Sequence, residues 1–295
     1  MDSLNYKARA KINLGLDVCR RLENGYHEVK MIMQTIDLYD ELVLRKRQEP
    51  DIVLLINSVD NLGKLEDNLI YKAVKCMRER YHIEQGIEVS LKKNIPVAAG
   101  MAGGSTDAAG VMLAINEMFA LGSSREELME LALPLGADIP FCIMGGTALA
   151  EGIGEKLTPL PKPPHADIVV VKPPIMVSTK KVYQSLDLGK METHPDIDGM
   201  VKALADGNLK GITQRMENVM ETVTEKEFPI ITDIKKMLTG NGALGAMMSG
   251  SGPSIFGVFQ DTATAADAAE YVRRTLEQKG IYAQIHVTTF YNQQE

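Results

Sequence analysis

Several kinds of residue are scarce in the sequence, and each scarcity excludes a class of function. There is no tryptophan and only 5% of the residues are aromatic, which leaves little material for an aromatic platform that stacks single-stranded bases. The three cysteines, Cys19, Cys76 and Cys142, lie far apart and form no CxxC pair. This argues against a disulfide framework or a zinc site and favours reduced thiols in the cytoplasm. The five histidines lack metal-ligand spacing, so no metal site is assigned to side chains.

Long apolar runs and basic stripes are also missing. No stretch of eighteen apolar residues occurs, and the N-terminus lacks the basic-then-apolar layout of a signal peptide. The net charge is −7, whereas a nucleic-acid-binding protein would be expected to carry a basic surface. We therefore expect neither a membrane nor a nucleic acid as a partner.

The first clear pattern is an alternation of apolar and polar residues over 8–18. Alternation of this length predicts a half-buried strand, because successive side chains point to opposite faces. Lys11 and Asn13 would then project from one face, opposite the core.

A stretch of small residues at 96–106 leads into a helix expected at about 105–119. Small side chains let backbone N–H groups approach an anion, and the helix N-terminus adds further N–H groups. The alternative is a tight loop without a ligand, and no Walker A lysine follows. We predict a phosphate-binding loop that consists of Pro96, Val97, Ala98, Ala99, Gly100, Met101, Ala102, Gly103, Gly104, Ser105 and Thr106.

Two further segments are candidates for the site. The loop 249–253 contains Gly250, Ser251 and Gly252 and could either line the phosphate site or only turn the chain. Asp138 lies among small and apolar neighbours at 136–141. An aspartate in such a place is often a helix cap or turn residue, but it could also act as a base for an alcohol.

The order of expected elements indicates an α+β protein with two domains. Strands are expected at 28–38, 41–47, 51–57, 87–91 and 147–150, with helices at 67–81 and after Ser124. The segment 158–164 holds four prolines in seven residues and predicts a stiff linker. We therefore expect an N-terminal domain at 1–160 for ATP binding and catalysis. A C-terminal domain at 161–295 would bind substrate, with strands at 167–172, 253–260 and 281–290.

Together, the strand with Lys11, the loop 96–106 and the late loop 249–253 resemble the GHMP kinases, in the family's order along nearly the whole chain. The resemblance implies an N-terminal domain like domain 2 of ribosomal protein S5 and a ferredoxin-like C-terminal domain. It also implies ATP and Mg²⁺. Asp138 would accept the proton of a substrate hydroxyl, and Lys11 would stabilise the charge that grows on that oxygen.

Within the family, the segment Asn24-Gly25-Tyr26-His27-Glu28 is similar to that of members whose substrate is a cytidyl diphosphate sugar alcohol of isoprenoid biosynthesis. Tyr26 would stack on the pyrimidine and His27 would meet its polar edge. Tyr183 would supply a second ring, and Asn13 would hold the sugar alcohol. Alternatives are a kinase for another alcohol, such as homoserine or mevalonate, a decarboxylase of the same fold, and a non-catalytic member that senses a metabolite.

Some positions depart from the family. Ala98 and Ala102 stand where many relatives have glycine. Since alanine disfavours positive φ, we expect φ below zero at both.

Overall fold

A computed structural model describes residues 2–23, 25–58, 64–190 and 194–292, so Asn24 of the expected turn lies outside the described residues. Contacts divide the chain into two compact units. The first comprises residues 1–10, 38–97 and 102–145, and the second comprises 11–37, 98–101 and 146–295. The strands β1 (Ser3–Arg21) and β2 (His27–Arg47) each contribute residues to both units. The domain boundary expected at residue 160 stays a prediction.

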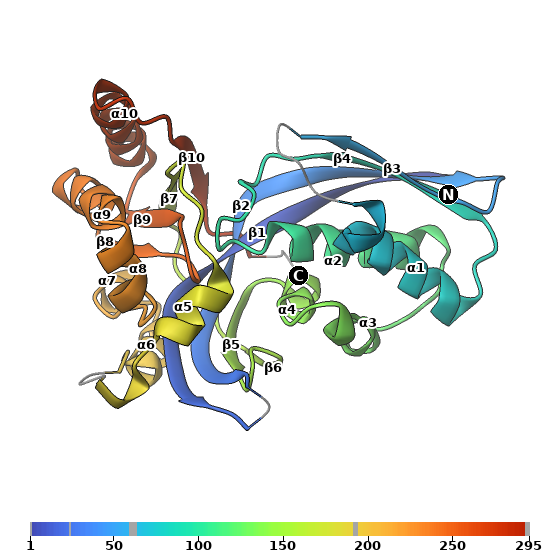
Figure 1. The fold of residues 1–295 in the computed structure, drawn as a ribbon, viewed down its shortest axis with the longest axis horizontal. Helices are drawn as coiled ribbons and strands as arrows, with labels where there is room; N and C mark the ends of the chain where they lie inside the picture. Colours follow the sequence, from blue (N-terminus) through green and yellow to red (C-terminus); the bar gives the residue numbers. More distant parts are fainter. Residues whose placement is uncertain (1, 24, 59–63, 191–193, 293–295) are drawn as a thin grey trace. The chain divides into compact units, whose positions relative to one another are not determined.

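The first unit packs helices on one face of a sheet (Figure 1). In this sheet β3 (Ile52–Asn57) runs parallel to β4 (Gly86–Lys92), and β4 runs antiparallel to Glu41–Arg47 of β2. The helix α1 turns Ile70, Ala73, Val74 and Met77 inward at helical spacing, and the Asn68 side chain caps it. The helices of this unit are α1 (Leu69–Tyr81), α2 (Gly103–Met118), α3 (Arg125–Ala132) and α4 (Ile139–Met144), with 3₁₀ turns at Leu65–Asp67 and Leu133–Leu135.

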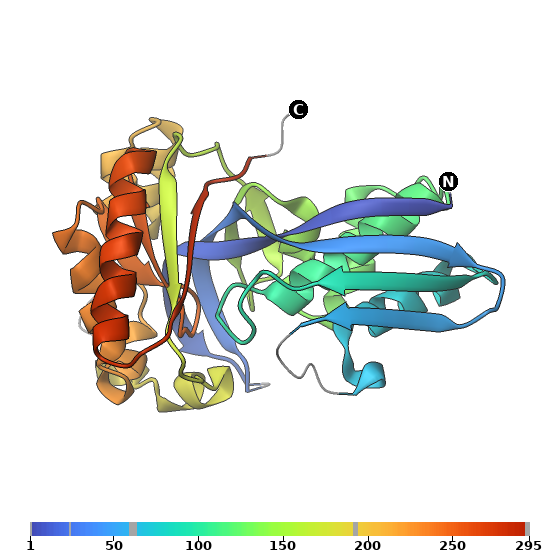
Figure 2. The same cartoon turned by 90° about the horizontal axis from the view of Figure 1, so that it is seen from above.

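The second unit is built on a four-stranded antiparallel sheet in the order β10-β7-β9-β8. Helices α9 and α10 lie along one side of this sheet (Figure 2). Elsewhere in the unit, Met31–Gln34 of β2 pairs with β5, which pairs with β6. The strands are β5 (Thr147–Glu151), β6 (Lys156–Pro159), β7 (Asp167–Lys172), β8 (Gly245–Met248), β9 (Ile255–Phe259) and β10 (Gln284–Thr289).

Among the described residues, six shorter helical elements and one long helix complete the second unit. They are α5 (Thr179–Ser185), the 3₁₀ turn Leu188–Lys190, α6 (Ile197–Ala205), α7 (Leu209–Thr213), α8 (Glu221–Glu227), α9 (Ile230–Gly240) and α10 (Thr262–Gln278). In the part of the chain that the structure describes, no helix combines the length and apolar character needed to cross a membrane.

The strand β1 differs from the expected half-buried strand. The alternation is present, but every residue from Ala10 to Val18 is buried. Lys11 is 5% exposed and Asn13 is fully buried, so the prediction that they lie opposite the core on an open face is wrong. Other backbone segments of the second unit cover this polar face, as described below.

Candidate active site

The loop 96–106 connects β4 to α2 and has a left-handed backbone at every second position between 98 and 102. Ala98 has φ of +50°, Gly100 of +74° and Ala102 of +56°. The expectation of negative φ at the two alanines is therefore wrong. Left-handed residues turn successive N–H groups toward a common concavity, which is how backbone nests bind anions. The loop keeps this conformation although alanine makes it less favourable than glycine would.

The helix α2 begins at Gly103, within the stretch 96–106, and has no capping side chain. Ala102 occupies the N-cap position and forms no side-chain cap bond. The first N–H groups of a helix have no partner within the helix, so they can bind an anion and the helix dipole favours its charge. Thr106 is buried and its hydroxyl donates to the Arg9 carbonyl oxygen. The residues at this helix start thus fit a phosphate group through backbone rather than through the Thr106 side chain.

The loop 249–252 packs against residues 98–101 within the second unit. The Ser249 hydroxyl donates to the Gly100 carbonyl oxygen at 3.0 Å. A Cβ on Gly100 would lie 2.1 Å from the Ser249 carbonyl oxygen, so no larger residue fits there. Gly250 and Gly252 also have positive φ, and Ser251 shares a hydrogen bond of 2.7 Å with Thr179. The two small-residue loops that the sequence singled out are therefore neighbours.

Lys11 and Asn13 lie beside these two loops. The Lys11 backbone N–H donates to the Met101 carbonyl oxygen at 3.3 Å, and its ammonium donates to Asn13 Oδ1 at 2.9 Å. A Cβ on Gly250 would lie 3.7 Å from Asn13 Oδ1. The Asn13 amide nitrogen contacts Met31 Sδ at 3.2 Å. The second unit thus brings together a buried ammonium, a buried amide, residues 98–101 and the loop 249–252.

Asp138 belongs to the first unit, at the N-cap position of α4. Its carboxylate makes no cap hydrogen bond, so it does not serve α4 in the way that the alternative interpretation of this aspartate supposed. The role of Asp138 as a base stays a prediction.

The predicted cytidine residues are partly gathered in the second unit. The rings of His27 and Tyr183 are stacked, with centroids 5.0 Å apart and planes at 24°. Burial, with a smaller contribution from the charge of Arg21, lowers the pKa of His27. His27 is therefore neutral at pH 7, with one ring nitrogen as donor and one as acceptor. Tyr26 lies at the surface and is 61% exposed.

A buried charge cluster beside the loop 96–106 was missed by sequence reasoning. The Lys93 ammonium lies between the carboxylates of Asp40 and Asp107, with its Nζ 2.8 Å from Asp107 Oδ2, and Asp40 Oδ1 accepts the backbone N–H groups of Asn94 and Ile95. Asp107 Oδ1 has no hydrogen-bond partner among the described residues. Burial raises the pKa of Asp107 to about 8, despite the opposing charge of Lys93. Lys93 precedes the loop and Asp107 follows it, so the cluster joins the two ends of the loop.

The described residues hold no group of three or more histidine, cysteine, aspartate or glutamate side chains arranged to hold a metal ion.

Two family models match the chain: the GHMP kinase N-terminal domain at residues 68–146 and the GHMP kinase C-terminal domain at 200–278. A protein of Lachnospira eligens named 4-diphosphocytidyl-2-C-methyl-D-erythritol kinase is 49% identical over 96% of this chain and 98% of its own length. One of the same name from Acetivibrio thermocellus is 48% identical over 93% of this chain and 96% of its own.

The crystal structure of a 4-(cytidine 5'-diphospho)-2C-methyl-D-erythritol kinase is 31% identical, with a TM-score of 0.81 over 98% of this chain and 100% of that one. A homoserine kinase of Cytophaga hutchinsonii has a TM-score of 0.82 at 23% identity, over 98% of this chain and 95% of that one, and so shares the fold. Matches in both halves, and near-half identity along almost the full length of such relatives, mean that this chain belongs to the GHMP kinases, with their two-domain fold.

Proposed function

We propose that the protein is an ATP-dependent kinase that phosphorylates the 2-hydroxyl of 4-diphosphocytidyl-2-C-methyl-D-erythritol, a step of isoprenoid precursor biosynthesis. The observation that carries this proposal is the 49% identity to a protein named for that activity over 98% of its length. A cytoplasmic location and the absence of membrane and nucleic-acid partners stay predictions.

The phosphate donor fits the two loops. Backbone N–H groups of residues 97–105, which include the start of α2, would supply the donors. When bound, ATP would supply the phosphoryl group, and Mg²⁺ would offset the charge of its phosphates. The loop that contains Gly250, Ser251 and Gly252 would support residues 98–101, since the neighbouring Ser249 already donates a hydrogen bond to the Gly100 carbonyl oxygen.

The acceptor hydroxyl would be activated by Asp138 and Lys11. Asp138 would take the hydroxyl proton while a new O–P bond forms and the bond to ADP breaks. Lys11 would stabilise the charge on the attacking oxygen, and its hydrogen bond to Asn13 fixes the direction of its side chain. A charge pair at about 4 Å contributes roughly 4 kcal/mol at an effective dielectric of about 20. General base catalysis adds a factor of about 10²–10⁴.

The cytidine end would be bound by the aromatic residues. Tyr26 offers an exposed ring face, whereas His27 and Tyr183 already form a stacked pair. Because His27 is uncharged at neutral pH, it can both donate to and accept from the polar edge of cytosine. Asn13 would contact the methylerythritol end.

ADP release with Mg-ATP and 4-diphosphocytidyl-2-C-methyl-D-erythritol tests the proposal, with homoserine and mevalonate as parallel substrates and Asp138→Asn as the inactive control. ADP production that depends on the cytidyl compound alone is the expected result. Turnover of another alcohol instead would keep the kinase chemistry and overturn the substrate. ATP binding without turnover of any alcohol would overturn the enzyme assignment.

A further inference from the structure

The segment 217–221 links the strand β1, which carries Lys11, to the glycine loop 249–252. It is part of neither element. It fastens to β1 through Leu16, whose N–H donates to the Glu217 carbonyl oxygen at 2.9 Å and whose carbonyl oxygen accepts from Val219 N–H at 3.0 Å. The same strand carries Lys11 and Asn13. The segment is therefore tied to the strand that presents the ammonium.

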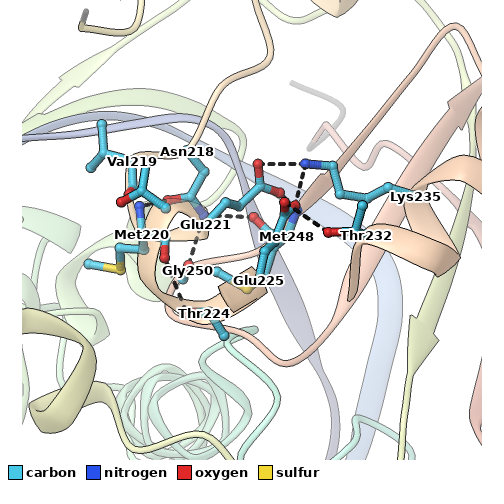
Figure 3. Close-up of polar contacts among 11 residues, drawn as sticks. Asn218, Val219, Met220, Glu221, Thr224, Glu225, Thr232, Lys235, Met248 and Gly250 are labelled. Atoms are coloured by element: carbon cyan, nitrogen blue, oxygen red, sulfur yellow. Dashed lines mark hydrogen bonds and ion pairs between the residues drawn. The ribbon is translucent and has the colours of Figure 1, made fainter. Parts of the chain in front are cut away.

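Asn218 connects this segment to the glycine loop. Its side chain is 2% exposed, and its Nδ2 donates to two carbonyl oxygens, those of Met248 and Gly250, each at 2.8 Å. Its Oδ1 accepts from Met220 N–H at 3.0 Å. Figure 3 shows the amide pointing at the start of the loop from the turn before α8. Both amide hydrogens of Asn218 are thus used to hold the loop backbone.

Glu221 holds the loop at a second point. Its Oε1 accepts Met248 N–H at 2.7 Å, and its Oε2 accepts from Lys235 Nζ at 2.7 Å (Figure 3). Lys235 also donates to Glu225 at 2.7 Å, and Glu225 accepts from the Thr232 hydroxyl at 2.9 Å. Met248 therefore has both its carbonyl oxygen and its N–H bound by side chains of one turn, which leaves the start of the loop little freedom.

These contacts close a ring of hydrogen bonds within the second unit. From β1 the ring runs through the segment 217–219 and the Asn218 amide to Gly250, and through the Ser249 hydroxyl to the Gly100 carbonyl oxygen. It returns to β1 through the bond from Lys11 N–H to the Met101 carbonyl oxygen. A closed ring of hydrogen bonds restricts the movement of its members relative to one another. The hydrogen bonds of the Asn218 amide therefore help to set the positions of the loop 249–252 and of residues 98–101 relative to Lys11.

We propose that Asn218 is a positioning residue of the kinase: its two donated hydrogen bonds hold the glycine loop, and through it residues 98–101, in register with Lys11. This inference rests on the proposed function for its kinetic consequence only. Asn218 contacts no reacting atom; it acts through the loop backbone.

Asn218→Asp tests the proposal, because a carboxylate of the same shape cannot donate to either carbonyl oxygen. We expect the kcat of folded enzyme to fall by at least about tenfold, since a displacement of about 1 Å in an active site can cost about 10²-fold. The KM for the alcohol should stay within about twofold of wild type, because no predicted alcohol-binding residue bonds to Asn218. A kcat within twofold of wild type would overturn the proposal.

The matched control is Asn208→Ala. Asn208 caps α7 by accepting from Gly211 N–H at 2.9 Å and is not a member of the ring described above. Loss of a cap lowers stability by about 1 kcal/mol, so this variant reports what a merely structural loss does to kcat. Equal falls in kcat for the two variants would refute positioning. Should Asn218→Asp fail to fold, Glu221→Gln weakens the hold on Met248 by losing the charge that pairs with Lys235, and a smaller fall in kcat is expected.

Amide hydrogen exchange gives a readout that needs no substrate. Ser249 N–H donates to Ser254 and Gly252 N–H donates to Ser249, while Lys11 N–H donates to Met101. In Asn218→Asp, peptides that cover 248–252 and Lys11 should exchange faster together, whereas Asn208→Ala should leave them unchanged. Faster exchange confined to 217–221 would overturn the ring. If the wild-type enzyme did not turn over the cytidyl compound, the substrate assignment would fail. The exchange measurement would still test whether the ring of hydrogen bonds couples the two loops to Lys11.

Discussion

Replacing Asp107 with asparagine should remove a pH dependence of stability. Two carboxylates, Asp40 and Asp107, share one ammonium, that of Lys93, in the core of the first unit. The single ammonium of Lys93 can balance only one negative charge. Asp40 also accepts hydrogen bonds from two backbone N–H groups, which favour a negative charge on Asp40 over one on Asp107. Burial therefore keeps the proton on Asp107, whose pKa is about 8 against the ordinary 3.8.

The sign of this pH dependence follows from which state, folded or unfolded, binds the proton of Asp107. Between about pH 4 and 8 the folded protein keeps the Asp107 proton and the unfolded chain has lost it. Raising the pH through this window therefore lowers the free energy of unfolding, with a slope of about 1.4 kcal/mol per pH unit for one proton. Asp107→Asn lacks the titrating group. Relative to wild type, its free energy of unfolding should rise by about 2.6 kcal/mol between pH 5 and 7.

Urea unfolding of both proteins at pH 5, 6 and 7 measures this difference. Asp267→Asn, which alters an exposed carboxylate on α10, is the control and should run parallel to wild type. Should Asp107→Asn also run parallel to wild type, the carboxylate would be ionised across this range, and the attraction of Lys93 would outweigh burial.

Three further predictions concern the site. Asp138→Asn should lower kcat by about two orders of magnitude or more while ATP affinity, measured by equilibrium binding, changes little; near-normal turnover would reject Asp138 as the base. Ala102→Gly should raise the free energy of unfolding in urea by about 0.5–1 kcal/mol, because the left-handed conformation disfavours alanine. Ala114→Gly, in the interior of α2, should lower it, and equal effects would contradict the reasoning. Tyr183→Ala should weaken CDP binding measured by calorimetry and, by exposing His27, raise the His27 pKa in an NMR titration; an unchanged CDP affinity would remove Tyr183 from the site.

The local sequence pattern was sufficient to predict most helices and strands, but it did not predict which residues distant in the sequence pack against them. The alternation at 8–18 predicted β1 correctly, yet it could not indicate that residues more than 200 positions away cover its polar face. The Gly250 backbone lies against Asn13 on this face: a Cβ on that glycine would be 3.7 Å from Asn13 Oδ1. Whether both faces of a strand are buried depends on tertiary contacts. The polar residues at alternate positions suggested instead that one face is exposed to solvent.

The expected break between strands at 39–40 is another instance. The structure has a single strand, β2, through this point. Asp40 resembles a turn residue in the sequence, but it is buried and its partner Lys93 lies 53 residues away. A buried aspartate inside a strand is tolerated only with such a partner, and the sequence does not reveal pairings at that distance.

Two strands were missed for local reasons. β6 contains Pro159 of the supposed linker and pairs only with β5, at an edge of its sheet where a missing N–H is tolerated. β8 begins at Gly245, after a glycine-rich turn that reads as a loop. For the site, the motifs singled out Lys11, Asn13 and both loops, whose roles stay predictions. Asn218 was missed because its partner Gly250 lies 32 residues further along the chain.

The division of β1 and β2 between two units sets an order of events during synthesis. The second unit needs residues 11–37, which emerge early, and residues up to Tyr291, whose N–H donates to the Thr35 carbonyl oxygen at 2.9 Å. At about 5–20 residues per second, the ribosome needs on the order of tens of seconds to make the intervening chain. For that time the apolar residues Ile12, Leu14 and Leu16 lack their final neighbours. Residues 11–37 are thus the part of the second unit that stays longest without its final partners during synthesis.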